Sequence, residues 1–508
     1  MKRILRHFAN TGLAAAVTAL CAGVTLPALA ADLRIGLQDD ADVLDPHRAR
    51  TFVGRIVFTS LCDKLFDINE KLEIQPQLAE SWKWSDDGKV LSVKLRNNGK
   101  FHDGATITAA DVKANLERAK TLPESLRKSE VASIDSIKVV DDTNLEIHLL
   151  KPDASLLSQL ADRAGMILSP KAFANGDFAQ NPVCSGPYKF VSRVQNDRIV
   201  LEKFSDYWDT ANYHFDKVTF LPIQDTTVRL ANLQSGSLDL IERVASADIE
   251  AVKNDSKLAF YPVTGTGYQA LTFNMTKGDK DSFPIGHDKR VRQAFELSID
   301  RNAINEVVGQ GVFQPAHQPF PPSSFAYDKK FETVTRDVEK AKALLKEAGL
   351  ERVKFEIAYG NNSTSQQVYE LIQAMASEAG FDISLRPTEF AALQSALKEK
   401  SYEVGQSGWS GRADPDGNIH QFDTCKGNLN DAGYCNEKVD ALLNKARETT
   451  DQAQRKAIYD EAQAILQDEL PIVYLYYQPW PFAARADLKG FVAYPDGMVR
   501  LKGVSITN

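Results

Sequence analysis

One polar loop, Gly408-Trp-Ser-Gly-Arg-Ala-Asp-Pro-Asp416, gathers the residues best suited to chemistry. A large aromatic ring between glycines is poorly explained by core packing, so we expect Trp409 to stack on a ligand, with backbone groups of Ser410 nearby. Arg412 and Asp414 follow, and charged side chains hold ligand groups of opposite sign through charge-assisted hydrogen bonds. Burial of Trp409 against its own lobe is the structural alternative.

The sequence shows no machinery for catalysis. It has no G-x-S-x-G elbow and no H-E-x-x-H pattern, and its eight histidines are scattered singly. Asp414-Pro-Asp-Gly417 begins like a calcium loop, but Cys425 stands where that loop needs glutamate. Gly265-Thr-Gly-Tyr-Gln-Ala270 matches a dinucleotide pattern loosely, and a β-like segment follows it instead of a helix. We therefore expect a binding protein without cofactor or metal site, with a hydrolase as the distant alternative.

The first 30 residues have the build of a secretory signal peptide. Three basic residues precede an apolar run from Leu13 to Leu26 and an A-x-A cleavage pattern that ends at Ala30. The run has about 14 residues, and a membrane anchor needs roughly 20. Leu20 precedes Cys21 where a lipid-attachment site needs a small residue, which favours a free periplasmic protein over a lipoprotein.

Charge and length narrow the class further. Cleavage removes three of the 60 Lys and Arg residues and none of the 68 Asp and Glu residues, which leaves a net charge of −11. Such an acidic balance argues against nucleic acid as a partner, because phosphate binding needs a basic surface. The remaining 478 residues exceed one hydrophobic core and predict two or three compact units.

Four cysteines remain after export, an even number that favours two disulfides in an oxidising compartment. Cys425 and Cys435 are close in sequence and flank a polar loop, so we expect them to pair. Cys62 would then pair with Cys184. Zinc is the weaker alternative, because no C-x-x-C pair and no adjacent histidine occurs.

Strand and helix patterns alternate along the chain. Residues 31–275 favour short strands, such as Leu91–Arg96 and Leu145–Leu150, which alternate apolar and polar residues. Residues 285–470 favour amphipathic helices, predicted over 337–349, 366–380, 437–447 and 452–470. An apolar, β-prone stretch, 471–477, and a strand-like tail from Leu488 follow. This order fits a first lobe that the C-terminus completes, with two chain crossings as the hinge.

An ordered set of segments resembles one known family. The set comprises Val43–His47, Gln75–Trp82, Leu95–Gly104, Ala110–Val112, Ser185–Tyr188, Leu271–Asn274, Asp288–Asp300 and Gly408–Asp416. On these segments the chain resembles the family 5 extracellular solute-binding proteins, which bind dipeptides, oligopeptides and nickel. Within the set, Lys100–Gly104 predicts a tight turn with a structural His102, and Val291–Ile299 has the spacing of a core helix.

The resemblance implies an α/β, two-lobed periplasmic binding protein fold of type II, with mixed sheets flanked by helices. Lobe 1 would cover residues 31–272, with an extra subdomain at about 72–180, and lobe 2 residues 273–476. Residues 477–508 would return to complete lobe 1. The fold would close around a small ligand and deliver it, as a monomer, to an ABC permease with ATPase subunits.

The resemblance also implies the ligand contacts, and here the chain departs from the pattern. Dipeptide-binding relatives carry an acid for the ligand ammonium where Arg412 stands, and an arginine in the loop that corresponds to Tyr359–Ser365. This loop has Asn361 but no arginine. Arg412 and Asp414 would then hold the carboxylate and the ammonium, unless Arg412 points to solvent or pairs with Asp414. With Tyr268 as a cleft residue, the predicted contacts are Tyr268, Asn361, Trp409, Ser410, Arg412 and Asp414.

A short peptide is the first ligand candidate from the family. An arginine beside neutral polar groups would also suit an opine, a sugar-like solute or another acidic solute. A metal chelate or heme stays open as well, because some relatives bind them.

Overall fold

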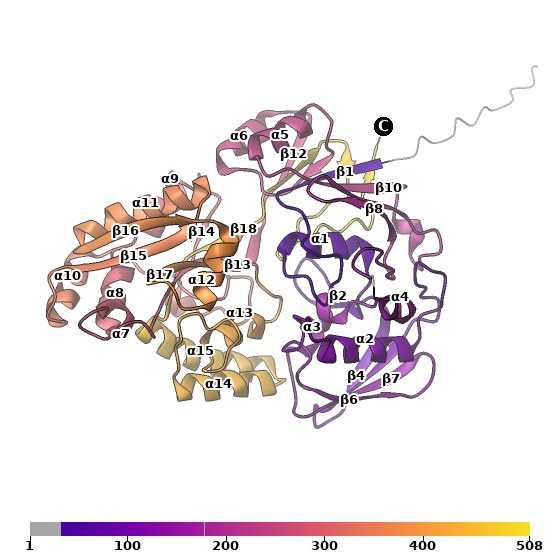
Figure 1. The fold of residues 1–508 in the computed structure, drawn as a ribbon, viewed down its shortest axis with the longest axis horizontal. Coiled ribbons are helices and arrows are strands. Elements are labelled where there is room, and N and C mark those ends of the chain that lie inside the picture. The colour runs from indigo at the N-terminus through magenta and orange to yellow at the C-terminus, as the bar shows by residue number, and fades with distance from the viewer. Residues whose placement is uncertain (1–31, 177, 508) are drawn as a thin grey trace, which may run out of the picture.

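Two mixed β-sheets with helices on their faces organise the computed structural model, which describes residues 32–176 and 178–507 (Figure 1). The predicted signal peptide, residues 1–30, lies outside the described residues. The first sheet has seven strands in the order β12-β19-β11-β1-β10-β9-β8. Their bounds are β1 Asp32–Leu37, β8 Tyr188–Val194, β9 Arg198–Lys203, β10 Lys217–Pro222, β11 Leu240–Ile241, β12 Leu258–Tyr261 and β19 Phe482–Arg485. β1 runs parallel to both of its neighbours, β10 and β11.

The second sheet has six strands in the order β14-β18-β13-β17-β15-β16. Their bounds are β13 Thr264–Phe273, β14 Gln314–Pro315, β15 Val353–Gly360, β16 Phe381–Thr388, β17 Val404–Trp409 and β18 Ile472–Pro479. β15 is parallel to β16 and to β17, so these three strands end at the same edge. In α/β sheets ligands bind outside the carboxyl ends of parallel strands.

A third, antiparallel sheet of four strands, β4-β5-β7-β6, lies within the part of the chain between β1 and β8. Its strands are β4 Ala79–Trp84, β5 Val90–Leu95, β6 Ile134–Val139 and β7 Asn144–Leu149. Leu91, Val93 and Leu95 alternate with exposed residues and face a core that includes residues of α2 (Ala109–Thr121) and α3 (Leu156–Leu160). The two strands predicted here from period-two patterns are thus present, each within one residue.

The amphipathic helices form where their patterns predict them. Asp337 caps α10 (Val338–Glu347) by accepting from the Lys340 N–H, and Gly349 follows at a φ of +80°. The other predicted helices are α11 Ser363–Glu378, α14 Glu437–Glu448 and α15 Gln452–Glu469, and α8 Lys289–Leu297 buries the predicted core positions. The remaining α-helices are α1 Phe52–Leu61, α4 Pro170–Ala174, α5 Thr226–Gln234, α6 Ile249–Asn254, α7 Pro284–His287, α9 Arg301–Val307, α12 Phe390–Lys398 and α13 Asp416–Asp423. The short strands are β2 Phe66–Ile68, β3 Ile74–Pro76, β20 Leu488–Lys489 and β21 Ser505–Ile506.

The chain passes between the two large sheets twice, at neighbouring places. It leaves the first sheet after β12 and enters the second at β13, and it returns from β18 to β19. The Trp480 N–H donates to the Val263 carbonyl at 2.9 Å, so the two crossings form one antiparallel ribbon. We call the part built on the first sheet, with the four-stranded sheet, the first lobe, and residues 264–479 the second lobe. The chain enters the second sheet at Thr264, before the expected lobe boundary at residue 272, and leaves it at Pro479, after the expected boundary at residue 476. The predicted lobe boundaries stay predictions.

The C-terminal tail differs from the strand-like segment expected from its composition. Between β19 and residue 507 its strands are only β20 and β21, of two residues each. Apolar side chains of the tail, Phe491, Met498, Val499 and Leu501, instead join the core of the first lobe. Burial of these side chains, not backbone pairing, accounts for the apolar composition.

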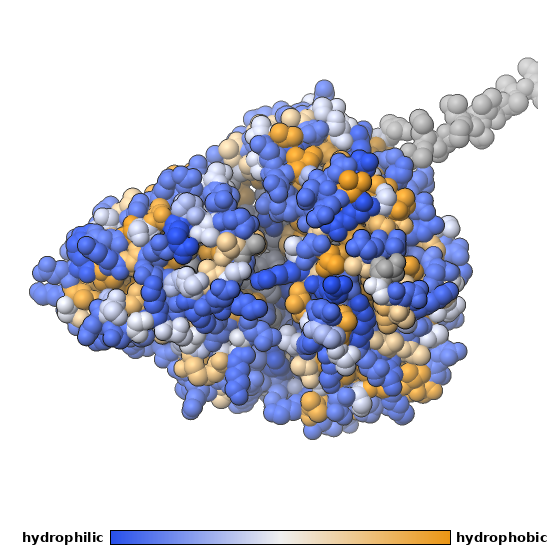
Figure 2. All heavy atoms as spheres, in the orientation of Figure 1, coloured by the Kyte–Doolittle hydropathy of each residue, from blue (hydrophilic) through white to orange (hydrophobic). Residues whose placement is uncertain are grey.

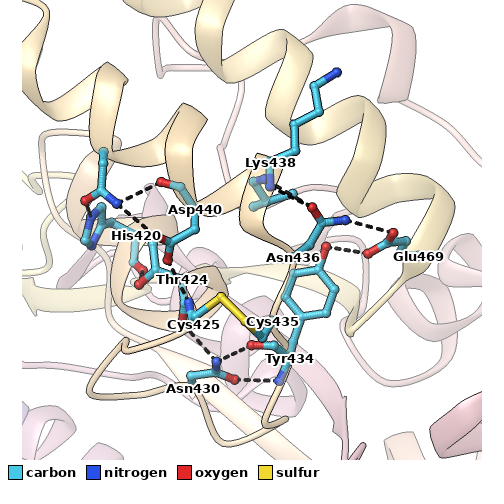
Figure 3. Close-up of a disulfide and its surroundings, with 12 residues drawn as sticks. His420, Thr424, Cys425, Asn430, Tyr434, Cys435, Asn436, Lys438, Asp440 and Glu469 are labelled. Carbon is cyan, nitrogen blue, oxygen red and sulfur yellow. Dashed lines mark hydrogen bonds between the residues drawn. A yellow bond between two sulfur atoms is a disulfide. The ribbon is translucent and has the colours of Figure 1, made fainter.

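Both predicted disulfides are present in the structure. Cys62 is bonded to Cys184 and Cys425 to Cys435. Figure 3 shows how the loop between the second pair is held: the Asn430 amide donates to the Thr424 and Tyr434 carbonyls at 2.9 and 2.6 Å. The Cys425–Cys435 disulfide is therefore one of several interactions that hold this loop against α13 and α14. Within residues 32–176 and 178–507, no helix is long and apolar enough to cross a membrane.

The turn around His102 forms as predicted. Gly104 has a φ of +87°, and the His102 ring contacts the Gly186 carbonyl at 3.0 Å through Nε2. Burial lowers the pKa of His102 to about 4, so the ring is neutral at pH 7. His102 thus ties two segments of the first lobe together.

Candidate ligand-binding site

The loop after β17 reaches from the second lobe to the first. The Asp414 N–H donates to Ser158 Oγ at 3.2 Å, and Arg412 Nε lies 3.4 Å from Asp162 Oδ2. Ser158 and Asp162 belong to α3 and the turn after it, in the first lobe. A second set of contacts lies beside this one: the Ala154 N–H donates to the Arg447 carbonyl at 2.9 Å. The two lobes therefore meet at the carboxyl end of β17, and Figure 2 shows a furrow between them with mostly hydrophilic residues along it.

Trp409 ends β17 and is half-buried. Its indole N–H donates to Asn418 Oδ1 at 3.0 Å, and its ring meets the edge of Phe422 with centroids 5.1 Å apart. The Arg412 guanidinium lies 4.4 Å from the Trp409 ring, a cation–π distance. The aromatic platform is thus held on two sides, and its stacking on a ligand stays a prediction.

Two glycines around Trp409 serve close packing. A Cβ on Gly267 of β13 would lie 1.9 Å from the Trp409 carbonyl oxygen. A Cβ on Gly411, where φ is +81°, would lie 2.2 Å from Thr266 Oγ1. Only glycine permits this approach of the loop to β13, so these glycines give the loop a fixed shape and not flexibility.

The Arg412 side chain is only 10 % exposed, and among the described residues its hydrogen-bond and ion-pair partners are Ser410, Gly411 and Asp162 and not Asp414. Its Nη1 donates to the Gly411 carbonyl at 2.8 Å, and its Nε faces Asp162. Burial first, and then the positive charge of Arg55, lower the pKa of Arg412 to about 10. Arg412 therefore remains charged at pH 7 at the contact between the lobes.

Asp414 has a partner within its own lobe. Arg455 of α15 donates to both carboxylate oxygens at 2.8 Å in a bidentate ion pair, and both side chains are largely buried. Charge-assisted bidentate pairs of this kind are strong and geometrically specific. A ligand ammonium at Asp414 would have to compete with Arg455, and the role of Asp414 as its partner stays a prediction.

Tyr268 lies inside β13 and not on an exposed loop. It is 1 % exposed, its ring packs edge-on against Tyr474 at 4.8 Å, and its hydroxyl donates to the Asn418 carbonyl at 3.4 Å. The surrounding strand, Thr264–Phe273, also explains why the glycine pattern does not cradle a phosphate. Tyr268 is therefore a core residue that pairs with Trp409 across β13 and β17 in this arrangement of the lobes.

The other two predicted contacts lie at the same edge of the second sheet. Ser410 directly follows β17 and is half-buried, with the Arg412 guanidinium 3.5 Å from its hydroxyl. Asn361 directly follows β15, is exposed, and pairs its N–H with the Thr388 carbonyl at 3.0 Å. Because β15 and β17 are parallel neighbours, the structure brings Asn361 and the Trp409 loop to one edge.

Asn418 of α13 organises the loop, and the sequence analysis did not single it out. Its Oδ1 accepts from the Trp409 indole and from the Arg412 N–H, and its Nδ2 donates to the Arg412 carbonyl at 2.9 Å. Asn418 is 2 % exposed, so these bonds are formed away from water. The position of this asparagine directly after Asp-Pro-Asp-Gly417 is the sequence signal that could have indicated it.

Four further charged residues of the first lobe face this loop and were also missed. They are Arg55 of α1, together with Arg127, Asp162 and Arg163. Arg55 binds Asp162 through Nη2 at 2.8 Å, and Asp162 also faces Arg412. Arg55 is the one charged residue in the helix Phe52–Leu61, which is the signal that could have found it.

Aromatic rings and arginines pack together at the ribbon between the lobes. Trp480 stacks on Phe52 with ring centroids 4.3 Å apart and planes 2° from parallel. The Arg243 guanidinium lies 5.1 and 5.2 Å from these two rings, and Arg243 has a left-handed φ of 51°. Such backbone conformations are unfavourable for residues other than glycine and gather at functional sites. The Arg55 guanidinium lies 5.9 Å from the Phe52 ring and also binds Asp162, so this packing is continuous with the contact between the lobes.

No group of three or more His, Cys, Asp and Glu side chains with metal-binding geometry occurs among the residues that the structure describes. The arrangement of aromatic rings, guanidiniums and backbone groups is suited to holding an organic solute through stacking and ionic hydrogen bonds.

Comparison with known proteins identifies the family. The model of the bacterial extracellular solute-binding proteins, family 5, matches residues 73–430. A glutathione-binding protein, GsiB of Pectobacterium atrosepticum, is 30% identical over 512 residues, covering 97% of this chain and 98% of that protein.

Solved structures agree in fold. AgaA of A. tumefaciens R10, in complex with agropinic acid, has a TM-score of 0.82 at 26% identity over 94% of this chain and 99% of that one. DppA of Helicobacter pylori, in complex with the peptide STSA, has a TM-score of 0.83 at 25% identity over 93% and 98%. These relatives are binding proteins with the two-lobed type II periplasmic fold. The chain therefore belongs to the bacterial extracellular solute-binding proteins of family 5.

Proposed function

We propose that this chain is the periplasmic substrate-binding component of an ABC importer, which closes its lobes around a small polar solute and delivers it to the membrane permease. The observation that carries the proposal is the loop after β17. It projects Trp409 and Arg412 from the carboxyl edge of one sheet and contacts Ser158 and Asp162 of the other lobe. A ligand held at this contact is enclosed when the lobes close, and closure is the signal that a permease can read.

A short peptide is the first ligand candidate. The named ligands of the relatives, glutathione and the peptide STSA, support it. In this role the protein binds and releases its ligand without changing it, acts as a monomer, and serves a permease driven by ATPase subunits. Export to the periplasm would follow from cleavage after Ala30.

A non-peptide acidic solute is the second candidate, and one observation favours it. The Asp414 carboxylate is engaged by Arg455, so the expected ammonium partner is occupied, whereas Arg412 lies among other arginines. The binding of agropinic acid by AgaA shows that this fold accepts such a ligand in a relative.

Analysis of the solute that accompanies the protein tests the proposal. The chain with its signal peptide would be produced in a Gram-negative host, purified from the periplasm in the cold, and denatured, and the released molecules would be identified by mass spectrometry. We expect one small, chemically intact solute at about one equivalent. Its re-addition to stripped protein should raise the melting temperature and reduce the radius of gyration in small-angle X-ray scattering.

A matched pair of variants makes the test specific to the site. Trp409→Ala should weaken binding of that solute by about tenfold, because a stacked ring contributes on the order of 1 kcal/mol beyond its buried area. Trp84→Ala, in the four-stranded sheet, should leave affinity unchanged. Two results would refute the proposed function: chemical conversion of the re-added solute, or a radius of gyration of the stripped protein that stays the same when any periplasmic extract is added.

A further inference from the structure

Four arginine side chains converge where the lobes meet. Arg55, Arg127 and Arg163 come from the first lobe and Arg412 from the second, and at most 10 % of each is exposed. Arg127 and Arg163 both donate to the carbonyl of Ala49, at 3.5 and 2.7 Å. We call these four residues the arginine cluster.

The carboxylates that contact the arginine cluster balance only half of its charge. Asp162 forms ion pairs with both Arg55 and Arg412, in which its Oδ2 lies 2.8 Å from Arg55 Nη2 and 3.4 Å from Arg412 Nε. Glu130 forms an ion pair with Arg127, with 2.5 Å between Glu130 Oε1 and Arg127 Nη1. Within the described chain the Arg163 guanidinium has no carboxylate at ion-pair distance. Four positive groups thus meet two negative ones, which leaves an excess of two positive charges in a buried place.

Several N–H groups of the cluster also lack acceptors. Arg55 Nη1, Arg127 Nε and Arg163 Nε are buried without a hydrogen-bond partner among the described residues. A buried donor without an acceptor costs about 1–3 kcal/mol, and more when it is charged. Burial and the neighbouring charge of Arg127 hold the pKa of Arg163 well below its usual range, as mutual repulsion requires.

A purely structural role does not account for this arrangement. Other buried arginines are either neutralised by a carboxylate, as Arg455 is by Asp414, or bound singly by backbone carbonyls, as Arg229 is. The arginine cluster differs because four guanidiniums meet at one place, with unpaired donors and an unbalanced charge, where the two lobes touch. Both deficits are removed by one added group, a dianion whose oxygens accept from the unpaired N–H groups.

We propose that the arginine cluster is a subsite for a solute with two negatively charged groups, and that this charge is required for the lobes to close. The inference rests on the proposed function and narrows its substrate class. Closure brings Arg412 towards three other arginines, so an empty site or a net-neutral ligand leaves repulsion that opposes closure. A zwitterionic dipeptide has one carboxylate and adds an ammonium, and therefore does not meet the requirement. A solute with two carboxylates, or a phosphate dianion, does.

Simple anions test the cluster without knowledge of the natural ligand. Thermal unfolding of ligand-stripped protein would be followed in succinate, in inorganic phosphate and in acetate, at one ionic strength set with chloride. We expect the two dianions to raise the melting temperature by several degrees more than acetate does. The same rise in all three buffers would overturn the proposal. A response to phosphate and not to succinate would assign the subsite to phosphorylated solutes, and the reverse to dicarboxylates.

Variants locate the effect. Arg163→Gln should abolish the difference between succinate and acetate, and Arg48→Gln, an exposed arginine of the same lobe, should keep it. If Arg163→Gln does not fold, Arg412→Gln, on the second lobe's side of the contact, serves instead and should reduce the difference at least fivefold. If both cluster variants keep the full difference in melting temperature between succinate and acetate, the inference is wrong.

The outcome separates the inference from the proposed function. If only the inference is wrong, the solute that accompanies the protein still contracts it in small-angle scattering, and Arg163→Gln binds this solute as tightly as the wild type does. If the proposed function is wrong, dianions still stabilise the protein through the cluster, but neither they nor any accompanying solute changes the radius of gyration.

Discussion

At the scale of single residues, two neighbouring charges of one loop have separate tasks. Arg412 faces the other lobe, whereas Asp414, two residues later, is turned into its own lobe by Arg455. The Asp414 and Arg455 side chains are 12 % and 5 % exposed, so removal of either charge leaves the other buried and unpaired. The geometry thus gives Asp414 a role in stability.

Asp414→Asn should lower the free energy of unfolding by roughly 3 kcal/mol, because it leaves the Arg455 charge without a counter-ion. Urea unfolding would measure the loss. Asp460→Asn, which breaks the half-exposed ion pair with Lys456 on the same helix as Arg455, is the control and should cost less than about 1 kcal/mol. An unchanged stability with affinity reduced tenfold or more would show instead that Asp414 holds the ligand ammonium.

At the scale of elements, the disulfides fasten segments of very different separation. Cys62 and Cys184 are 122 residues apart and lie in the core of the first lobe, whereas Cys425 and Cys435 are 10 apart at the end of α13. A cross-link lowers the entropy of the unfolded chain more when its loop is longer. Hydrogen bonds of Asn430 and Asp440 also hold the short loop, so it depends less on its disulfide.

The double variant Cys62→Ser/Cys184→Ser should therefore lose more stability than Cys425→Ser/Cys435→Ser. The loop-entropy relation gives roughly 5 kcal/mol for the long loop and roughly 3 kcal/mol for the short one. Urea unfolding of both variants under oxidising conditions compares them directly, each serving as the control for the other. Equal losses would mean that local packing at the sulfurs, and not loop length, sets the stabilisation.

At the scale of the whole molecule, the two lobes are joined by one narrow ribbon. Trp480 lies at its centre, packed on Phe52 and donating through its indole to the Pro495 carbonyl at 3.2 Å. Gly265 fits against Trp480 so closely that an added Cβ would lie 2.4 Å from the indole nitrogen. The angle between the lobes therefore depends on packing within a few residues of this ribbon.

Gly265→Ala should disturb closure without touching the ligand. The methyl group forces Trp480 or the backbone of Gln478 to move, so we expect a larger radius of gyration in the presence of the accompanying solute and weaker binding of it. Gly99→Ala is the control, because its Cβ would make ordinary contacts at 3.4 Å and beyond. Scattering curves identical to those of the wild type would place the hinge elsewhere.

Local patterns allowed much of this architecture to be predicted from the sequence. Helices such as α10 carry their caps and apolar stripes within one segment, and the cysteines could pair in few ways. The contents of the site depend on contacts between distant segments. Arg455 reaches Asp414 across 41 positions, and Arg55 and Asp162 are 107 apart. No periodicity signals such pairs, so the loop around Trp409 could be singled out but the partners of its charges could not.

The placement of both described ends of the chain has a practical consequence. β1 and the tail with β20 and β21 belong to the first lobe, and Figure 1 shows the C-terminus close to β1. Fluorescent tags fused at the two ends would both be attached to the first lobe, so the energy transfer between them would not change when the lobes move. A reporter of lobe movement needs its second dye within residues 264–479, on an exposed position such as Lys342 of α10. Topologically the second lobe is an insertion, and a biosensor made from this protein has to be labelled accordingly.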